Sequence, residues 1–147
     1  VVCCDPREEY HLTWDIPGTT FSKAMPDDIV LELQLDPHSA VIAVTHDPKL
    51  DDMVLLEALK SPAFYVGALG SRGNTAKRKE RLALFDLSAA EIGRLHGPIG
   101  LDLGSKTPAE IAVSIVAEIV AVKNGIVLTQ KKEGSSMPEA PGVCVRG

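Results

Sequence analysis

The sequence lacks the cysteine pattern of a metal-binding or disulfide-bonded protein. Its 147 residues include three cysteines, Cys3, Cys4 and Cys144, and none has a Cys-x-x-Cys or cysteine–histidine spacing that suits zinc. The adjacent Cys3 and Cys4 would fall on opposite faces of a strand, which makes them poor ligands for one metal. We therefore expect no metal site, and we interpret the thiols as buried groups of a cytoplasmic protein.

Long apolar runs and an excess of positive charge are also missing. No segment approaches the roughly 20 apolar residues that cross a bilayer, and no signal peptide is visible, so no membrane association is expected. The net charge is −5, whereas binding to nucleic acid normally needs a broad basic surface. Nucleic acid is therefore not an expected partner. Hydrophobic residues make up 45% of the chain, which suffices for one domain with a buried core.

Short apolar runs alternate with segments of helical periodicity. Strands are predicted over residues 1–4, 40–44 and 63–66, and helices over 26–33, 49–59, about 74–84, a short stretch from 88, and 107–123. Residues 8–25 read as a loop with a short strand, and residues 97–104 as a glycine-punctuated loop with a brief strand. Continuously apolar strands between helices predict an α/β fold whose parallel sheet is covered on both faces. Residues 1–125 would form this domain and residues 126–147 a flexible tail.

Polar residues that follow the predicted strands are candidates for a binding site, because such sheets bind ligands at the carboxyl ends of their strands. Asp5 is placed to accept hydrogen bonds from ribose hydroxyls, and Arg7 to pair with a phosphate. A simple turn is the alternative for both. The remaining candidates follow the second and third strands: Thr45, His46, Asp47, Gly67, Gly70, Ser71 and Arg72.

The segment that begins at Tyr65 is the most informative, because an apolar run opens through glycines into a basic helix. Unpaired N–H groups at a helix N-terminus favour an anion. The basic segment, residues 72–81, carries five cations against the single acid Glu80: Arg72, Lys77, Arg78, Lys79 and Arg81. This local charge opposes the acidic average and predicts a phosphate-bearing partner. A solvated helix face is the alternative.

The residues around His46 permit several roles. His46 is a candidate proton carrier or ligand contact, or a histidine held by loop carbonyls. Asp47 is expected to cap a helix, and Asp51 and Asp52 need no role beyond that of first-turn acids stabilised by the helix dipole. A cation site formed by His46, Asp47 and Asp51 is a further alternative. No arrangement supports nucleophilic catalysis, so we assign no catalytic residue.

Five segments, taken in order, resemble signatures of the XdhC/CoxI family, accessory proteins for xanthine dehydrogenase and related molybdenum hydroxylases. They are residues 5–9, 44–51, 65–72, 96–104 and 107–115. The resemblance runs from about residue 1 to 125 and implies a Rossmann-like, three-layer α/β/α carboxyl-terminal domain. The family's first strand and glycine loop are missing from this chain, so we expect a piece of a longer protein. Gly100, in the fourth segment, joins the candidate cofactor-binding residues.

The resemblance also implies a function. Family members bind molybdenum cofactor (molybdopterin), protect it while a cysteine desulfurase provides its sulfur ligand, and deliver it to the apo-hydroxylase, typically as homodimers. We therefore predict a cofactor chaperone, and whether the chain also catalyses a reaction stays open. An NAD(P)-dependent oxidoreductase is the alternative, since the fold does not decide between them. A third interpretation is a fragment that mainly makes dimer contacts through the helix at 107–123.

Overall fold

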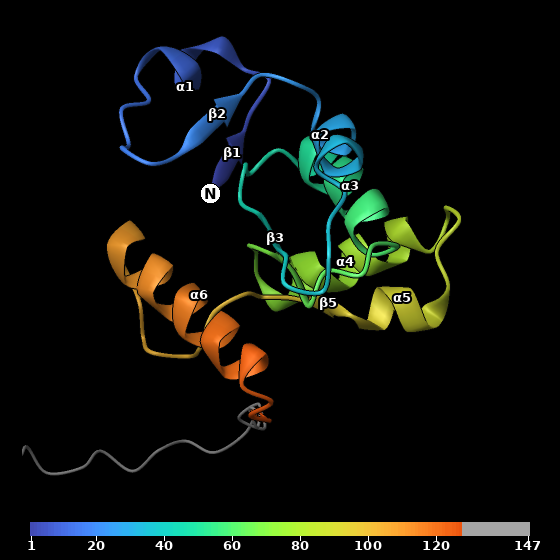
Figure 1. The fold of residues 1–147 in the computed structure, drawn as a ribbon. Coiled ribbons are helices and arrows are strands. Elements are labelled where there is room, and N and C mark those ends of the chain that lie inside the picture. The colour runs from blue at the N-terminus through green and yellow to red at the C-terminus, as the bar shows by residue number, and fades with distance from the viewer. Residues whose placement is uncertain (128–147) are drawn as a thin grey trace, which may run out of the picture.

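The strands form two parallel sheets in the computed structural model, which describes residues 1–127 (Figure 1). The smaller sheet pairs β1 (Val2–Cys4) with β2 (Thr20–Ser22). The larger has the order β3 (Ala40–Ala43), β4 (Tyr65–Ala68), β5 (Leu95–His96). The predicted parallel sheet is confirmed, divided into two blocks. All of the predicted tail except residues 126 and 127 lies outside the described residues.

Residues 1–127 also contain six helices, the first five between strands and the last after β5: α1 (Glu8–Leu12), α2 (Pro26–Leu33), α3 (Pro48–Ala58), α4 (Arg72–Leu82), α5 (Ala89–Gly93) and α6 (Pro108–Lys123). Helices α2, α3 and α6 match their predictions to within one residue. Ser88 and Thr107 form the capping boxes that their sequences predict, which satisfies N–H groups of the first turn. Within residues 1–127, no helix has both the length and the apolar character needed to cross a membrane.

Several predicted boundaries are wrong. Helix α1 lies in the segment expected to be a loop, and the brief strand expected in residues 97–104 falls earlier, at β5. Helix α4 is capped by Ser71, whose Oγ accepts a hydrogen bond from the Asn74 N–H at 3.1 Å, and not by Asn74 or Thr75. Strand β4 continues through Gly67, which therefore lies in the sheet and not in the glycine loop.

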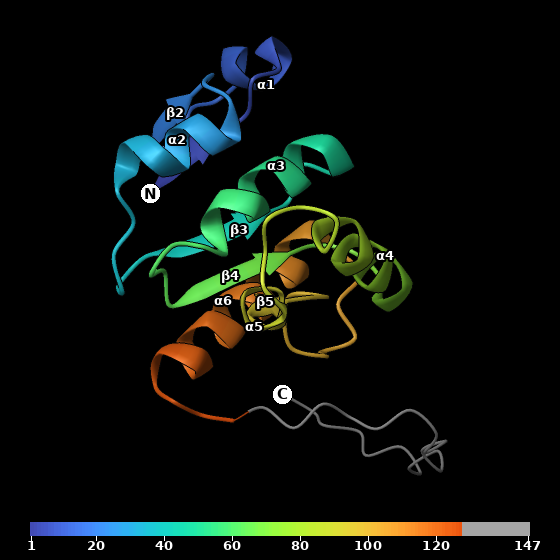
Figure 2. The same cartoon turned by 90° about the vertical axis from the view of Figure 1, so that its right-hand side faces the viewer.

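Helices cover both faces of the larger sheet, which confirms the three-layer arrangement (Figure 2). Successive residues of β4 point to opposite faces. One face packs with α3 and α4 in a cluster that includes Val66, Ala68, Leu55, Leu59 and Leu82. The other packs with α6 through Tyr65, Ile99 and Ile115. Burial of each large apolar side chain stabilises the fold by about 1.5–3 kcal/mol, so these two clusters fix α4 and α6 on either side of the carboxyl end of β4.

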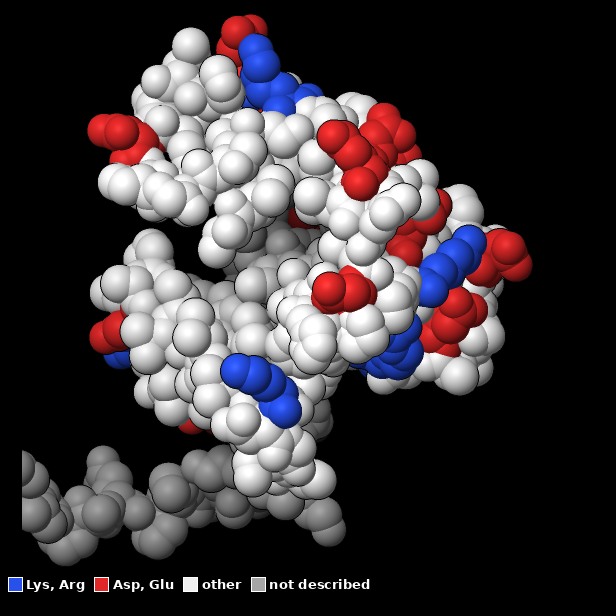
Figure 3. All heavy atoms as spheres, in the orientation of Figure 1, with Lys and Arg blue, Asp and Glu red and all other residues white. Residues whose placement is uncertain are grey.

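The two sheets leave a hollow on one face of the molecule. Figure 3 shows it between the part that carries β1 and β2 and the part that carries α6, with uncharged side chains around it. The outer side of α6 is apolar, because Val113, Val116 and Val120 are 62%, 58% and 49% exposed. A helix that is apolar all round is typical of one that is covered on more than one side.

Candidate functional site

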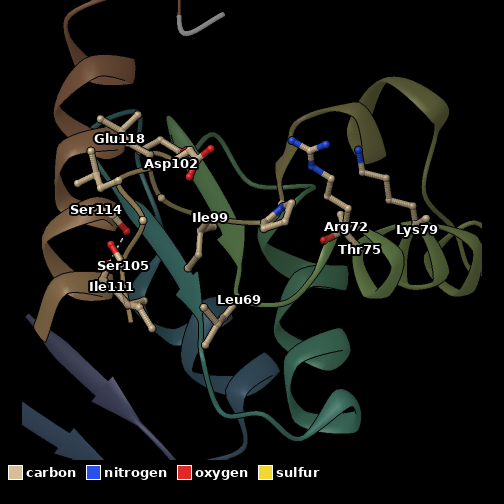
Figure 4. A pocket seen from close by; sticks show the side chains of 17 residues that line it. Leu69, Arg72, Thr75, Lys79, Ile99, Asp102, Ser105, Ile111, Ser114 and Glu118 are labelled. Atoms are coloured by element: carbon tan, nitrogen blue, oxygen red, sulfur yellow. Dashed lines mark hydrogen bonds between the residues drawn. The ribbon is translucent and has the colours of Figure 1, made fainter. Parts of the chain in front are cut away.

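A cavity of about 730 Å³ opens beyond the carboxyl end of β4, between α4 and α6 (Figure 4). We call it the loop cavity, because residues 97–105 form much of its wall. The other lining residues come from the end of β4, from α4 and from α6: Leu69, Arg72, Thr75, Ala76, Lys79, Ile111, Ser114 and Glu118. Its volume falls within the range of about 300–1,000 Å³ that holds small ligands.

Hydrogen bonds and close packing fix the loop that lines this cavity. The Ile99 N–H donates to the Ala68 carbonyl at 3.3 Å, and the Leu101 N–H donates to the Ser114 carbonyl at 3.1 Å. Gly100 has φ +95°, and a Cβ there would overlap the Ser114 Oγ. Only glycine meets both conditions without strain. The predicted residue Gly100 therefore lines the cavity and also lets the loop pack against α6.

Opposite charges lie on the two walls of the loop cavity. Figure 4 shows Arg72 and Lys79 on α4 at one side, Glu118 on α6 at the other, and Ile99 between them. The α4 wall also carries the helix N-terminus, where backbone N–H groups and the dipole favour an anion. A ligand with an anionic group at one end and hydrogen-bond donors at the other would fit this distribution.

Two buried side chains, Tyr65 and Glu118, form with the half-buried His96 a cluster beside this cavity that the sequence did not predict. The Tyr65 hydroxyl donates to Glu118 Oε1 at 2.6 Å, and the His96 ring stacks on Tyr65 with centroids 4.6 Å apart. Burial, and then the bond to Glu118, raises the pKa of Tyr65 well above its usual value. Burial lowers the pKa of His96, although its Nδ1 lies 3.8 Å from Glu118 Oε1. The sequence feature that could have indicated this cluster is Glu118 itself, because it is an acid within the apolar repeat of α6.

A second cavity, of about 200 Å³, lies on the other side of α4 and includes His46 and Gly70 in its lining. Beside it is an ion-pair network made of two acids from α3 and two arginines from α4: Asp51, Asp52, Arg78 and Arg81. Arg78 Nη2 lies 3.6 Å from Asp51 Oδ2, and its Nε lies 3.1 Å from Asp52 Oδ1. Arg81 Nε donates to Asp52 Oδ2 at 2.7 Å.

This network ties together the ends of β3 and β4. Asp51 Oδ1 accepts hydrogen bonds from the N–H and hydroxyl of Thr45, at 3.1 and 2.6 Å, and Arg78 Nη1 donates to the Leu69 carbonyl at 3.2 Å. The prediction that Asp51 has no role beyond the first turn is therefore wrong, and Asp52 is likewise part of the network. Two of the five cations in the basic segment are thus paired with acids of α3, Arg78 in the interior and Arg81 nearer the surface.

Asp5 and Arg7 pair with each other. Arg7 Nε donates to Asp5 Oδ1 at 2.9 Å, and Arg7 Nη2 donates to Asp5 Oδ2 at 2.7 Å and to the Thr45 carbonyl at 3.3 Å. The hydrogen bond from Arg7 lowers the pKa of Asp5 against the effect of burial. Through Arg7, this pair links the end of β1 to the end of β3. The carboxylate of Asp5, a residue only 8% exposed, therefore already has an internal partner.

The structure places the sequence-predicted residues in separate positions. The ends of β1 and β3 bring together Asp5, Arg7 and Thr45. The small cavity is lined by His46 and Gly70, and the loop cavity by Arg72 and Gly100. The caps of α3 and α4 are Asp47 and Ser71, and β4 contains Gly67. Asp47 Oδ1 accepts from the Lys49 N–H at 2.9 Å, as predicted for a cap. Within residues 1–127, no group of three acidic, histidine or cysteine side chains is arranged to hold a metal ion.

Parallel strands, helices on both faces and a cavity at the carboxyl ends of the strands define a Rossmann-like α/β domain. The chain belongs to the XdhC family, because the XdhC Rossmann domain model matches residues 1–119. A crystal structure described as a xanthine dehydrogenase from Bacillus halodurans aligns with a TM-score of 0.65 and 27% identity, covering 92% of this chain and 37% of that one. The predicted family and fold are thus confirmed.

Curated relatives agree with this assignment. The chain is 34% identical over 104 residues to a probable xanthine dehydrogenase subunit of Bacillus subtilis, covering 70% of this chain and 29% of the relative. It is 30% identical over 105 residues to the molybdenum cofactor insertion chaperone PaoD of Escherichia coli, covering 71% and 31%. It is 33% identical over 109 residues to the E. coli protein YqeB, covering 74% and 20%. The chain thus spans about a fifth to a third of the length of these relatives.

Proposed function

We propose that this chain is the cofactor-binding domain of an accessory protein that holds molybdenum cofactor, protects it and delivers it to xanthine dehydrogenase or a related molybdenum hydroxylase. Family membership and the role that PaoD is named for support this proposal. The observation that carries it is the loop cavity, which is large enough for a pterin and has a cationic wall at the N-terminus of α4. Molybdopterin, a pterin with a phosphorylated side chain, has the matching shape and charge.

The phosphate end of the cofactor would lie at the start of α4. Arg72 and Lys79 line that wall, and the α4 N-terminus adds its dipole. The pyrophosphate of a dinucleotide form would use the same groups and extend past Gly70 towards the small cavity. On this proposal Asp5, Arg7, Thr45 and Asp47 act through internal bonds that set the positions of the strand ends, and Gly67 acts through packing under the cavity.

An NAD(P)-dependent oxidoreductase remains a second candidate with less support. Its ribose would need the acid at the end of β1, which is Asp5. Both oxygens of that carboxylate already accept hydrogen bonds from Arg7. The chaperone therefore accounts better for the geometry, because its ligand is placed at α4, away from this ion pair.

Further partners belong to the same proposal. A cysteine desulfurase would provide the sulfur ligand while the cofactor is bound, and the exposed valines of α6 support a homodimer contact at that helix. Cys3 and Cys4 are free thiols, which supports a reducing, cytoplasmic setting. Gel filtration with light scattering and a pull-down with the hydroxylase would test these partners.

The deciding experiment is to purify the full chain from a host that makes molybdenum cofactor, denature it, oxidise the extract and measure pterin fluorescence, with nicotinamide nucleotides assayed in parallel. We expect nearly stoichiometric pterin. Arg72→Ala should reduce the bound pterin about tenfold, equivalent to about 1.4 kcal/mol of affinity, whereas Lys49→Ala, a cation removed from an exposed position outside the cavity lining, should not change it. Nicotinamide without pterin would overturn the proposal in favour of an oxidoreductase.

A further inference from the structure

Glu118 is a buried acid on the wall of the loop cavity that the phosphate contacts do not use. Its side chain is 11% exposed, and it lines the cavity opposite Arg72 and Lys79 (Figure 4). A buried carboxylate is costly unless donors or a cation satisfy it. Glu118 therefore marks a position where the cavity favours a ligand that brings hydrogen-bond donors.

The protein satisfies this carboxylate only in part. Within residues 1–127, the side-chain hydrogen bond to Glu118 comes from the Tyr65 hydroxyl and reaches Oε1. The basic group beside it is His96, with Nδ1 at 3.8 Å. Burial lowers the pKa of His96, so the imidazole is largely neutral near pH 7 and does not balance the acid. The cationic groups of the cavity lie on the opposite wall, on α4.

We propose that Glu118 binds the paired N–H groups of a 2-amino-4-oxopyrimidine edge, the edge that a pterin presents, while the phosphate of the same ligand lies against Arg72 and Lys79. The inference rests on the proposed function and names the group that recognises the pterin ring. The two oxygens of a carboxylate accept two parallel N–H bonds, as they do from a guanidinium group. The 2-amino group and the neighbouring ring N–H have this same parallel arrangement.

Tyr65 is the positioning residue for this recognition. Its hydroxyl holds Oε1 in place, and its raised pKa keeps the proton on the phenol at all physiological pH values. Gly67 leaves room for this arrangement, because a Cβ there would overlap the Tyr65 hydroxyl and Ile99. The Tyr65 bond orients the carboxylate, so its loss should weaken binding without removing the preference for the amino group.

The test compares two fluorescent ligands on the full chain. One is neopterin phosphate, and the other is the lumazine with the same phosphorylated side chain, which has a carbonyl in place of the 2-amino group. The native chain should bind the pterin at least about tenfold more tightly, since each unsatisfied buried polar group weakens binding strongly. E118Q should lower pterin affinity about tenfold and reduce the preference to within about twofold, whereas the exposed control Glu32→Gln should change neither.

Two further measurements keep the test decisive. Y65F should bind both ligands a few-fold more weakly with the pterin preference retained, and thermal unfolding of each variant reports whether it is folded. If E118Q does not fold, the assignment of Glu118 is judged from the preference for the pterin over the lumazine in the native chain and in Y65F. Pterin recovered from the purified chain together with equal affinity for the two phosphates overturns the Glu118 assignment alone. Absence of recovered pterin together with no binding of either phosphate overturns both this assignment and the proposed function.

Discussion

The two sides of α4 use charged side chains in opposite ways. On one side, Arg78 and Arg81 enter the ion-pair network with Asp51 and Asp52, and Arg78 is only 6% exposed. On the other, Lys79 faces the loop cavity and has no ion-pair partner among residues 1–127. One helix therefore carries structural cations and candidate ligand-binding cations within a few residues of each other.

Helical spacing explains the separation. Residues three or four apart lie on the same side of a helix. Asn74, Lys77, Arg78 and Arg81 line the small cavity, whereas Arg72, Thr75, Ala76 and Lys79 line the loop cavity. A count of charges along the segment combines the two sides and so overstates the charge available to a ligand. The position of each cation on the helix has to be resolved before its charge is assigned to a site.

The largest expected loss of stability comes from a substitution that breaks the ion-pair network. Arg78→Met should destabilise the chain by about 3–5 kcal/mol, because it leaves Asp51 buried without its cation. Lys79→Met, its neighbour on the other side, should change the free energy of unfolding by no more than about 0.5 kcal/mol. Urea unfolding of both variants measures the difference. Equal destabilisation would show that the two sides do not differ in structural importance.

A smaller effect is expected when the loop cavity is altered at a glycine. Gly100→Ala should destabilise by about 2–4 kcal/mol, because the new Cβ meets Ser114 in a backbone conformation unfavourable to alanine. Gly104→Ala is the matched control: φ is also positive, at +69°, but nothing lies within 4 Å of a Cβ there. Gly104→Ala should lower the free energy of unfolding by about 1 kcal/mol. Similar losses in thermal unfolding would argue that the contact with Ser114 is unimportant.

The smallest expected effect concerns the pH dependence of stability. It distinguishes the two sides of α4, because the loop cavity adjoins the half-buried His96, whereas the ion-pair network is made only of acids and arginines. Burial lowers the pKa of His96 below its ordinary 6.5, so protonation favours the unfolded chain. The contribution of His96 to stability is fully present above pH 6.5. It is lost as the pH falls through the lowered pKa that His96 has in the folded state.

His96→Gln should therefore flatten the loss of stability between about pH 7 and 5. Urea midpoints measured across this range test it, with exposed His38→Gln as the control. A slope that is unchanged in the His96 variant would mean that this histidine is not linked to folding. Asp5, whose pKa is lowered by Arg7, acts in a separate window, since its contribution is lost only as pH falls below about 4.

Local rules predicted much of the fold. Asp47, Ser88 and Thr107 cap the helices that they were expected to cap, because capping depends on a few adjacent residues. The apolar repeat of α6 and the buried strands were likewise readable from periodicity. Gly67 was misplaced in a loop because glycine is usually a loop signal, whereas here it sits in β4 to admit Tyr65 and Ile99. The contact between Gly67 and Ile99 joins segments far apart in the sequence, so local rules do not predict it.

The candidate site was harder to predict for the same reason. Arg72 was found from a local motif and Gly100 from the family resemblance, and both line the loop cavity. Glu118 was missed, because its importance arises from a hydroxyl 53 positions away, on Tyr65. Asp51 was given too small a role, because nothing local shows that Arg78 will reach it. Pairing between distant charged and polar groups is the part that one sequence leaves undetermined.

The division of the sheet into two blocks has a consequence for how the chain behaves at high concentration. Strands β1 and β3 each end a sheet, and Ile42 and Val44 beside the β3 edge are 39% and 45% exposed. An unpaired strand edge is a template for another strand. The β1 and β3 edges can therefore pair with a further strand, from the same polypeptide or from a second molecule, and such pairing between molecules would lower the solubility of the domain.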